Sequence, residues 1–221
     1  MFKLAKPLTA AALALAAMAG AAIAEYPEKP VEFVIAAGAN SPYDDIQGLA
    51  DHAKSNDVVL GHFGAPLVPT KVTMGLAKEM GFSFASDAAF DMLDCNTLAS
   101  GDVDVINTTL QLILPCLGDV KVLASVGSER IPLTPNTPTV AEIAPDMNVS
   151  LWNGLFVHKD TPQDVREKII AVASKTVMSE RAQKLAAETG ALVYWQSADE
   201  VKEQIASDIS TLGHIGKVLG N

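Results

Sequence analysis

The sequence predicts an α/β fold with largely parallel sheets. Short apolar segments with the composition of strands alternate along the chain with longer segments in which apolar residues recur at helical spacing. Two helical segments also begin with the reciprocal spacing of a capping box. Such alternation is typical of α/β proteins, in which helices cover the faces of a sheet.

Six segments are predicted to be strands. Each is short and apolar, and punctuating residues bound several of them, as Gly64 does after residues 58–63. Residues 102–106 alternate acidic and apolar side chains, which is typical of a strand with one buried face. In chain order the predicted strands are residues 31–36, 58–63, 102–106, 121–126, 151–157 and 191–195.

The segments between these strands are predicted to be helices. Residues 139–142 and 197–200 have capping-box spacing, Thr161 precedes a proline at a predicted helix start, and Gly190 is placed to end a helix. The longer predicted helices are residues 41–55, 70–80, 88–99, 110–117, 161–177 and 197–215, with another ending at Gly190.

The N-terminus has the features of a secretory signal peptide. Lys3 and Lys6 precede an apolar, alanine-rich run over residues 8–23, and Ala22 and Ala24 are small residues at the cleavage positions. We expect cleavage after Ala24, which would remove residues 1–24, leave 197 of the 221 residues and export the mature chain to the periplasm. The alternative is a membrane anchor, although the run has fewer large apolar residues than a stable span needs.

The chain is acidic. Its formal net charge is −10, from 16 Lys and Arg against 26 Asp and Glu, and loss of Lys3 and Lys6 with the leader would make it −12. No long block of one sign occurs, which argues against nucleic acid and anionic membrane surfaces as partners. An anionic ligand stays compatible with this charge, because a few backbone amides can create a local positive site.

Cys95 and Cys116 are the two cysteines of the chain. In an oxidising compartment two such thiols can pair as a disulfide. The alternative is that both are small buried residues on neighbouring helices, because cysteine often behaves as a compact apolar side chain. The spacing in the sequence leaves both interpretations open.

The sequence contains no recognisable catalytic or metal-binding motif. His52, His62, His158 and His214 never fall at zinc-ligand spacing, and none has a cysteine at such a spacing. No serine lies in a nucleophile elbow and no lysine in a phosphate-binding loop, and the turn after the first predicted strand lacks a full dinucleotide fingerprint. We therefore predict no metal, no cofactor and no enzymatic activity.

The loop at residues 61–70 is the most informative segment for function. It leaves a predicted strand, precedes a predicted helix and contains small residues that let a ligand approach the backbone closely. Backbone amides at the start of a helix suit a carboxylate, because they are donors aligned with the helix dipole. The alternative is a tight turn with a purely structural role.

Several short motifs carry a family resemblance through their order along the chain. They are Tyr-Pro-Glu-Lys-Pro-Val at residues 26–31, residues 41–56, Gly-Asp-Val-Asp-Val at residues 101–105, and residues 122–142 followed by Ser-Leu-Trp-Asn-Gly-Leu-Phe at residues 150–156. In this order they resemble the Bug family, the TctC-like periplasmic solute-binding proteins of tripartite tricarboxylate transporters. The resemblance covers nearly all of the mature chain.

The resemblance implies a two-lobed periplasmic binding protein of type 2, the Venus-flytrap architecture, without catalysis. Family members are longer, and the shortfall falls after the first predicted strand, so we expect a shortened first lobe. We expect lobe 1 to comprise residues 25–40 and 149–221, and lobe 2 to comprise residues 41–148.

The resemblance also implies a site in which two facing loops hold one carboxylate of the ligand, largely through backbone amides and water. One loop matches residues 61–70, and residues 36–40 are the remnant of the other. The implied binding residues are Gly61, His62, Phe63, Gly64 and Thr70, with Ala37, Gly38 and Asn40 opposite, and Asn107 and Trp152 closing two strand-like segments.

The partners implied are a small organic carboxylate and the membrane permease subunits of the transporter. We expect a monomer unless the shortened lobe drives association, because a lobe without part of its sheet exposes core surface and unpaired strand edges. The alternative function is a non-transporting sensor or interaction module of the same fold that has no ligand of its own.

Overall fold

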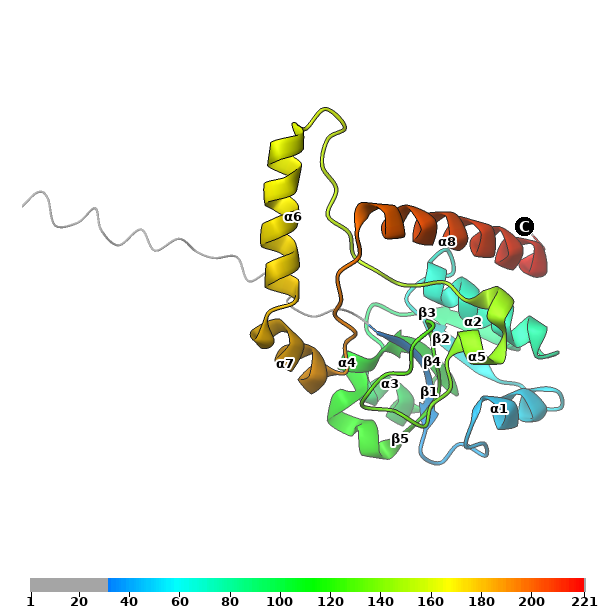
Figure 1. The fold of residues 1–221 in the computed structure, drawn as a ribbon. Helices are drawn as coiled ribbons and strands as arrows, with labels where there is room; N and C mark the ends of the chain where they lie inside the picture. Colours follow the sequence, from blue (N-terminus) through cyan, green and yellow to red (C-terminus); the bar gives the residue numbers. More distant parts are fainter. Residues whose placement is uncertain (1–31, 221) are drawn as a thin grey trace, which may run out of the picture.

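The computed structural model describes residues 32–220 (Figure 1). A five-stranded sheet forms the centre of the fold. The strands are β1 (Phe33–Gly38), β2 (Val59–His62), β3 (Ser86–Ala89), β4 (Val105–Thr109) and β5 (Val120–Ser125), in the order β3-β2-β4-β1-β5. The predicted signal peptide, residues 1–24, and its cleavage site after Ala24 lie outside the described residues.

The sheet is less parallel than the sequence predicts. β2 runs parallel to β3 and β4, whereas β1 runs antiparallel to both β4 and β5. The predicted strands at residues 151–157 and 191–195 are wrong, because neither segment forms a strand. A strand needs a neighbour to complete its backbone hydrogen bonds, and residues 32–220 form no second sheet to supply one.

Helices cover both faces of the sheet. On one face, here the α2 face, lie α1 (Ile46–Ala53), α2 (Val68–Glu79), α5 (Val140–Ile143), the short 3-10 helix η2 (Pro145–Met147) and α8 (Ala198–Leu219). On the other, here the α4 face, lie α3 (Cys95–Ser100), α4 (Leu110–Ile113) and the 3-10 helix η1 (Leu114–Asp119). Each face has its own apolar core. The core on the α2 face contains Leu60 of β2 and Leu76 of α2, and the core on the α4 face contains Ile106 of β4 and Ile113 of α4.

Capping residues set several helix boundaries as predicted. Capping boxes start α5 at Thr139 and α8 at Ser197, and Gly190 ends α7 (Glu180–Thr189) with a φ of +71°. The predicted helix over residues 88–99 is correct only for its last five residues, because β3 pairs with β2 and the capping box of Asp94 starts α3 at Cys95. Thr161 is not the cap of α6 (Gln163–Val177), since Pro162 occupies that position.

A disulfide joins Cys95 to Cys116. Their Cα atoms lie 6.0 Å apart, within the range that a disulfide spans. The bond connects α3 to η1 on the α4 face, which decides between the two interpretations that the sequence left open. It cross-links residues that are 21 positions apart, so we expect it to restrict the unfolded chain.

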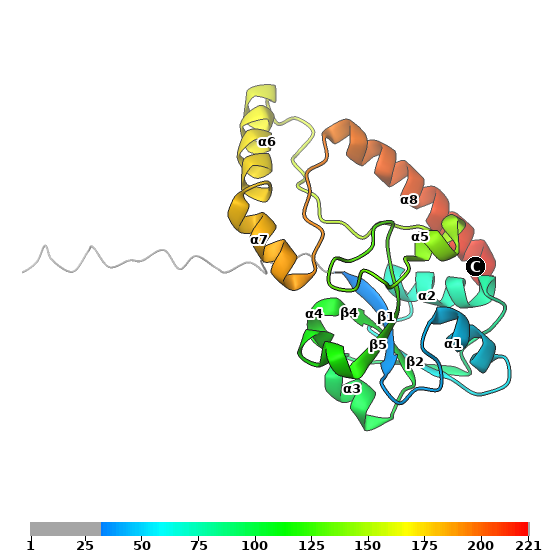
Figure 2. The same cartoon turned by 60° about the horizontal axis from the view of Figure 1, so that its bottom comes forward.

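Residues 155–194, here called the arm, project away from the sheet and its helices, here called the body (Figures 1 and 2). The arm contains α6 and α7, and two extended segments on either side of it lead to the body. The C-terminal end of α7 contacts the body, since Gln111 Nε2 donates to Thr189 O at 3.3 Å. No residue of α6 is buried.

The predicted division into lobes differs from the observed packing. β1 lies between β4 and β5, although residues 25–40 were expected in lobe 1 and residues 41–148 in lobe 2. Its apolar side chains, such as Val34 and Ile35, belong to the cores on the two faces of this sheet. α8, also expected in lobe 1, packs along α2. Of the residues expected in lobe 1, those of the arm stand apart from the sheet.

Glu32 links the start of β1 to the arm and should make stability depend on pH. Burial raises the pKa of its carboxyl above the ordinary value, and the hydrogen bond from Leu192 N, 3.1 Å long, opposes this rise. Because the pKa of Glu32 is higher in the folded than in the unfolded chain, the neutral carboxyl stabilises the folded protein at low pH. This stabilisation is lost as the pH rises through the folded-state pKa. Glu32→Gln keeps the acceptor and removes the charge.

We therefore expect Glu32→Gln to melt at a higher temperature than the parent chain at pH 7.5. The gap between the two melting temperatures should close at pH values below 4.5, the ordinary carboxyl pKa, where both side chains are neutral. Melting curves of both chains at pH 7.5, at two intermediate pH values and at a pH below 4.5 test this. A gap that does not change with pH would contradict it.

Candidate functional site

The carboxyl ends of β2 and β4 lie at one edge of the sheet. The two strands are parallel and Gly61 pairs with Ile106, so His62 and Asn107, each one residue further on, are neighbours. Asn107 also pairs with Ile35, whose side chain belongs to the core on the α2 face, so the side chain of Asn107 points to that face as well. A short loop leads from β2 to α2, whose first turn contains Thr70.

We define the candidate site as His62, Thr70 and Asn107 together with the first turn of α2. The three side chains are 2%, 1% and 1% exposed. Each carries at least one polar atom that is buried and has no hydrogen-bond partner within the described residues: His62 Nδ1, Thr70 Oγ1, and both Oδ1 and Nδ2 of Asn107.

Such unpartnered atoms are unusual in a folded protein. Leaving one buried donor or acceptor unpaired costs about 1–3 kcal/mol, so few such atoms persist without a reason. In most proteins an ordered water or a ligand supplies the missing partner. The candidate site places four of these atoms on two adjacent strands, β2 and β4, and on the helix that follows β2.

Asp87 on β3 fixes the orientation of His62. His62 Nε2 lies 2.7 Å from Asp87 Oδ2, and this carboxylate is 45% exposed, whereas the ring is 2% exposed. A carboxylate can only accept a hydrogen bond, so Nε2 carries the proton that they share. The other ring nitrogen, Nδ1, therefore offers a lone pair while the ring is neutral.

The start of α2 provides donors. The first amides of a helix have no carbonyl one turn earlier to accept their hydrogen bonds. Pro69 has no N–H, which leaves the amides of Val68 and Thr70, and the N-cap residue Leu67 supplies no side-chain acceptor. Because the helix dipole also favours negative charge at this end, the start of α2 suits an anion.

Phe63 and Gly64 form the loop that precedes α2. Gly64 has a φ of +151°, a conformation that residues with side chains rarely adopt. Its carbonyl accepts a hydrogen bond from Leu67 N at 3.1 Å. The Phe63 ring packs edge-to-face on Phe33 with centroids 6.3 Å apart. The predicted residues Phe63 and Gly64 therefore lie beside the candidate site in the chain and in a defined turn.

The structure separates the remaining predicted residues from this site. Ala37, Gly38 and Asn40 lie at or beyond the end of β1, and Ala37 pairs with Val105, the first residue of β4. Because β1 is antiparallel to β4, these three residues are at the opposite edge of the sheet from Asn107. The structure therefore does not bring residues 37–40 together with the loop at residues 61–70.

Gly61 and Trp152 also lie elsewhere. A Cβ on Gly61 would meet Leu93 and Ile106 at 3.1 and 3.2 Å, so this position faces the core on the α4 face. Trp152 Nε1 donates to Asp208 Oδ2 at 2.9 Å, and this bond ties the segment before the arm to α8. Gly61 and Trp152 thus have packing roles in the structure.

Sequence reasoning missed Asp87 and Asp208. Asp87 directly precedes residues 88–99, whose pattern predicts a helix, and a partner 25 positions from His62 leaves no local signal. Asp208 lies on the inner side of α8 and accepts from Ser150 N at 3.2 Å as well as from Trp152. One acidic residue on the apolar stripe of a predicted helix is the only signal that could have pointed to it.

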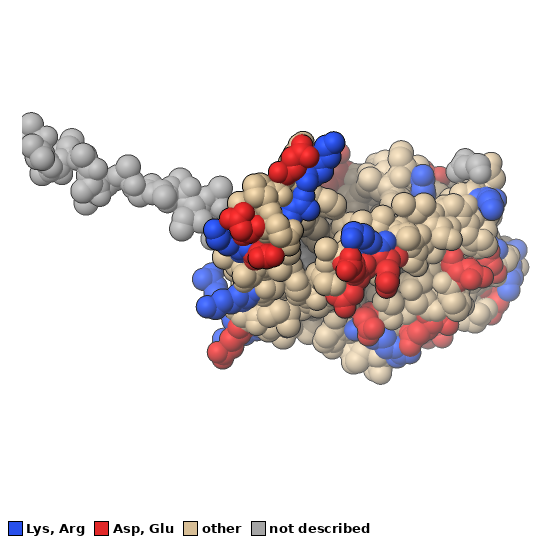
Figure 3. Space-filling model, turned by 45° about the horizontal axis from the view of Figure 1, so that its top comes forward, with Lys and Arg blue, Asp and Glu red and all other residues tan. Residues whose placement is uncertain are grey.

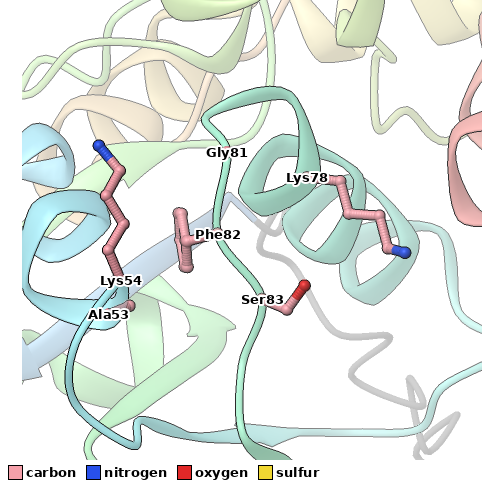
Figure 4. Close-up of a pocket in the computed structure, with 6 residues that line it drawn as sticks. All are labelled: Ala53, Lys54, Lys78, Gly81, Phe82 and Ser83. Carbon is pink, nitrogen blue, oxygen red and sulfur yellow. The ribbon is translucent and has the colours of Figure 1, made fainter.

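A surface hollow of about 440 Å³ lies at the other end of α2 (Figure 4). It is lined by Ala53, Lys54, Lys78, Gly81, Phe82 and Ser83. Lys54 pairs with Asp51 at 2.8 Å, and the carboxyl end of a helix dipole disfavours anions. No buried polar atom without a partner occurs among its lining residues. The hollow therefore has less to hold an anion than the start of α2.

Two further properties of residues 32–220 bear on function. No group of three or more His, Cys, Asp or Glu side chains in this part of the chain is arranged to hold a metal ion. No helix within the same residues is both long enough and apolar enough to cross a membrane.

The fold is similar to that of several solved periplasmic proteins. Rpa4515 of R. palustris with adipate has a TM-score of 0.69 at 17% identity over 87% of this chain and 66% of its own. A TctC solute-binding protein from Polaromonas has a TM-score of 0.68 at 18% identity over 87% and 67%. MatC of Rhodopseudomonas palustris with bound malate has a TM-score of 0.61 at 20% identity over 89% and 72%.

The fold is thus the mixed α/β fold of two-lobed periplasmic solute-binding proteins, in a shorter form that spans 66% of Rpa4515. Residues 17–220 match the family described as the tripartite tricarboxylate transporter family receptor, TctC. The chain belongs to this family, which confirms the resemblance found in its sequence. Its members are periplasmic binding proteins. A search of curated proteins finds no match.

Proposed function

We propose that this chain is a periplasmic receptor that binds a small organic carboxylate at the start of α2. The observation that carries the proposal is the set of buried, unpartnered atoms on His62, Thr70 and Asn107 next to free helix amides. A carboxylate accepts from the amides of Val68 and Thr70, and from Thr70 Oγ1 or Asn107 Nδ2. The ligand supplies the partners that these atoms lack.

The other two atoms indicate a preference among carboxylates. His62 Nδ1 in the neutral ring and Asn107 Oδ1 are acceptors, so they need a donor from the ligand or from water. A hydroxyl or amino group next to the carboxylate supplies one. The similarity to proteins solved with adipate and with malate supports small dicarboxylates as the first compounds to try.

Family membership supports the remaining parts of the proposal. The receptor acts without catalysis and delivers its ligand to membrane permease subunits of a tripartite tricarboxylate-type transporter. Its export by cleavage after Ala24 rests on the sequence of the N-terminus. A ligand that prefers the closed arrangement of the two lobes shifts the population toward it. In this shortened chain the arm and the body would be the two parts that close on the ligand.

Thr70→Val tests the site against a matched control on the same helix, Thr73→Val. Thr70 Oγ1 is unpartnered, whereas Thr73 Oγ1, also buried, donates to Pro69 O at 2.9 Å. Isothermal titration should show that Thr70→Val weakens carboxylate binding about tenfold, because one hydrogen bond of about 1.4 kcal/mol is lost. Thr73→Val should bind as tightly as the parent chain.

The two variants should rank in the opposite order when the free energy of unfolding of the ligand-free protein is measured. Thr73→Val loses a formed hydrogen bond and should unfold more easily, by about 1 kcal/mol. Thr70→Val removes an unpartnered hydroxyl, so the ligand-free protein should be at least as stable as the parent. Equal affinities for the parent and Thr70→Val across a panel that includes malate and adipate would overturn the proposed site.

A second candidate function is a sensor or interaction module of the same fold that has no ligand. The exposed apolar side chains of the arm favour it, because exposed apolar patches often mark interaction sites. Thermal unfolding of the mature chain separates the two candidates, since a ligand of the folded state raises the melting temperature. A cooperative transition that no carboxylate raises would favour the interaction module.

A further inference from the structure

The arm carries most of the exposed apolar surface in the described part of the chain. Eight of the twelve large apolar side chains that are exposed lie within its forty residues. They are Leu155, Phe156, Val157, Val165, Ile170, Val172, Met178 and Tyr194. Phe156 and Val172 are 76% and 67% exposed, and it is the concentration of such side chains in one stretch of the chain, not the exposure of any one of them, that marks an interaction surface.

The arrangement of α6 explains this exposure. Its fifteen residues are about 22 Å long at 1.5 Å a residue. Val165, Ile169 and Val172 recur at helical spacing, the pattern of a helix that covers a core. No residue of α6 is buried, and the segments beside it at residues 151–157 and 191–195 have no strand to pair with. The arm is an apolar layer without its second layer.

Charge distinguishes the arm from the body. The arm has six Lys and Arg against five Asp and Glu, a net charge of +1. Because the whole chain has a net charge of −10, the residues outside the arm have a net charge of −11. Figure 3 shows both signs interspersed on the arm, at the left, and more acidic clusters over the body. Two bodies would repel each other, whereas two arms would not.

We propose that the arm is the surface through which two copies of this chain form a dimer. The same patch on each copy meets across a two-fold axis, with α6 packed antiparallel to α6 of the partner, which closes the assembly at two chains. In this arrangement Lys175 lies toward the end of the partner helix that carries Asp164 and Glu167 together with Arg166 and Lys168, so charges of both signs meet there. Each copy supplies the apolar layer that the other lacks.

The size of the arm fits this role. A standard protein interface uses about 20–30 residues on each side, and its centre is apolar with a polar rim. The arm offers forty residues, with apolar side chains on α6 and in the segments around it and with balanced charges between them. The proposal does not depend on whether the candidate site binds a carboxylate.

Val172→Glu tests the dimer, and Ile209→Glu is its matched control. Val172 and Ile209 are both β-branched residues on helices, and their side chains are 67% and 66% exposed. Val172 lies on α6 in the arm, whereas Ile209 lies on α8 in the body. Sedimentation equilibrium of the mature chain should give a dimer for the parent and for Ile209→Glu. Val172→Glu should weaken dimerisation on the order of 100-fold, because the interface would bury two unpaired carboxylates, one from each copy.

Two further measurements complete the test. Circular dichroism should show that Val172→Glu folds like the parent, since the position is exposed in the single chain. Val172→Cys should form a disulfide-linked dimer on oxidation, whereas Ile209→Cys should not. A parent chain that stays monomeric at about 200 μM, well above the Kd of a stable dimer, would overturn the proposal. Polydisperse aggregates, or a dimer that Val172→Glu leaves intact, would also overturn it.

Discussion

Asn107→Leu is expected to weaken carboxylate binding strongly and to stabilise the ligand-free protein. Asn107 is 1% exposed in the middle strand β4, and both polar atoms of its amide lack partners. Leucine has a similar shape, and removing unpartnered polar atoms should raise the free energy of unfolding by about 1–3 kcal/mol. Two lost hydrogen bonds to the ligand should weaken binding on the order of 100-fold.

Asn148→Leu is the control for this prediction. Asn148 follows η2 and also has a buried Oδ1 without a partner, but it lies outside the candidate site. Titration of a dicarboxylate should show no loss of affinity in this variant. If Asn107→Leu destabilised the protein and bound the ligand as tightly as the parent, the interpretation of the unpartnered atoms as binding groups would be wrong. Urea unfolding and titration together give both results.

Asp208→Ala is expected to reduce the free energy of unfolding by about 3 kcal/mol. Asp208 is 7% exposed and accepts hydrogen bonds from Ser150 N, Trp152 Nε1 and Gln204 Nε2, at 3.2, 2.9 and 3.0 Å. Hydrogen bonds to a charged group are the stronger ones, and their loss leaves partly buried donors without an acceptor. The segment that leads to the arm would lose its attachment to α8.

Asp199→Ala is the matched change on the same helix. Asp199 is exposed in the first turn of α8 and pairs with Lys202 at 2.8 Å, an exposed contact that contributes little to stability. Urea unfolding should therefore separate the two alanine variants clearly. Limited proteolysis should also cut Asp208→Ala faster between residues 148 and 155. Equal unfolding curves for the two variants would contradict the anchoring role of Asp208.

The sequence predicted those parts of the fold that depend on local patterns. Capping boxes at Thr139 and Ser197 and the stop at Gly190 appear where expected, because these signals involve residues three or four positions apart. The antiparallel direction of β1 was not predictable in this way. It depends on pairing with β4, some seventy residues later in the chain.

The same distinction applies to the candidate site. The loop after β2 was predicted from its place between a strand and a helix, and His62 and Thr70 are buried there. Asn107 was a weaker prediction, and the register of β2 and β4 places it beside His62. Ala37, Gly38 and Asn40 were inferred from a facing loop, and the antiparallel pairing of β1 puts them at the opposite edge.

Amide chemical-shift mapping during titration of the mature chain with a small dicarboxylate tests the central claim most directly. If the ligand binds at the start of α2, the amides of Gly64, Val68 and Thr70, the side-chain amide of Asn107 and the imidazole of His62 should shift together and saturate at one concentration. Shifts confined to Lys54, Lys78 and Gly81, around the hollow at the other end of α2, or no saturable shifts at all, would contradict it.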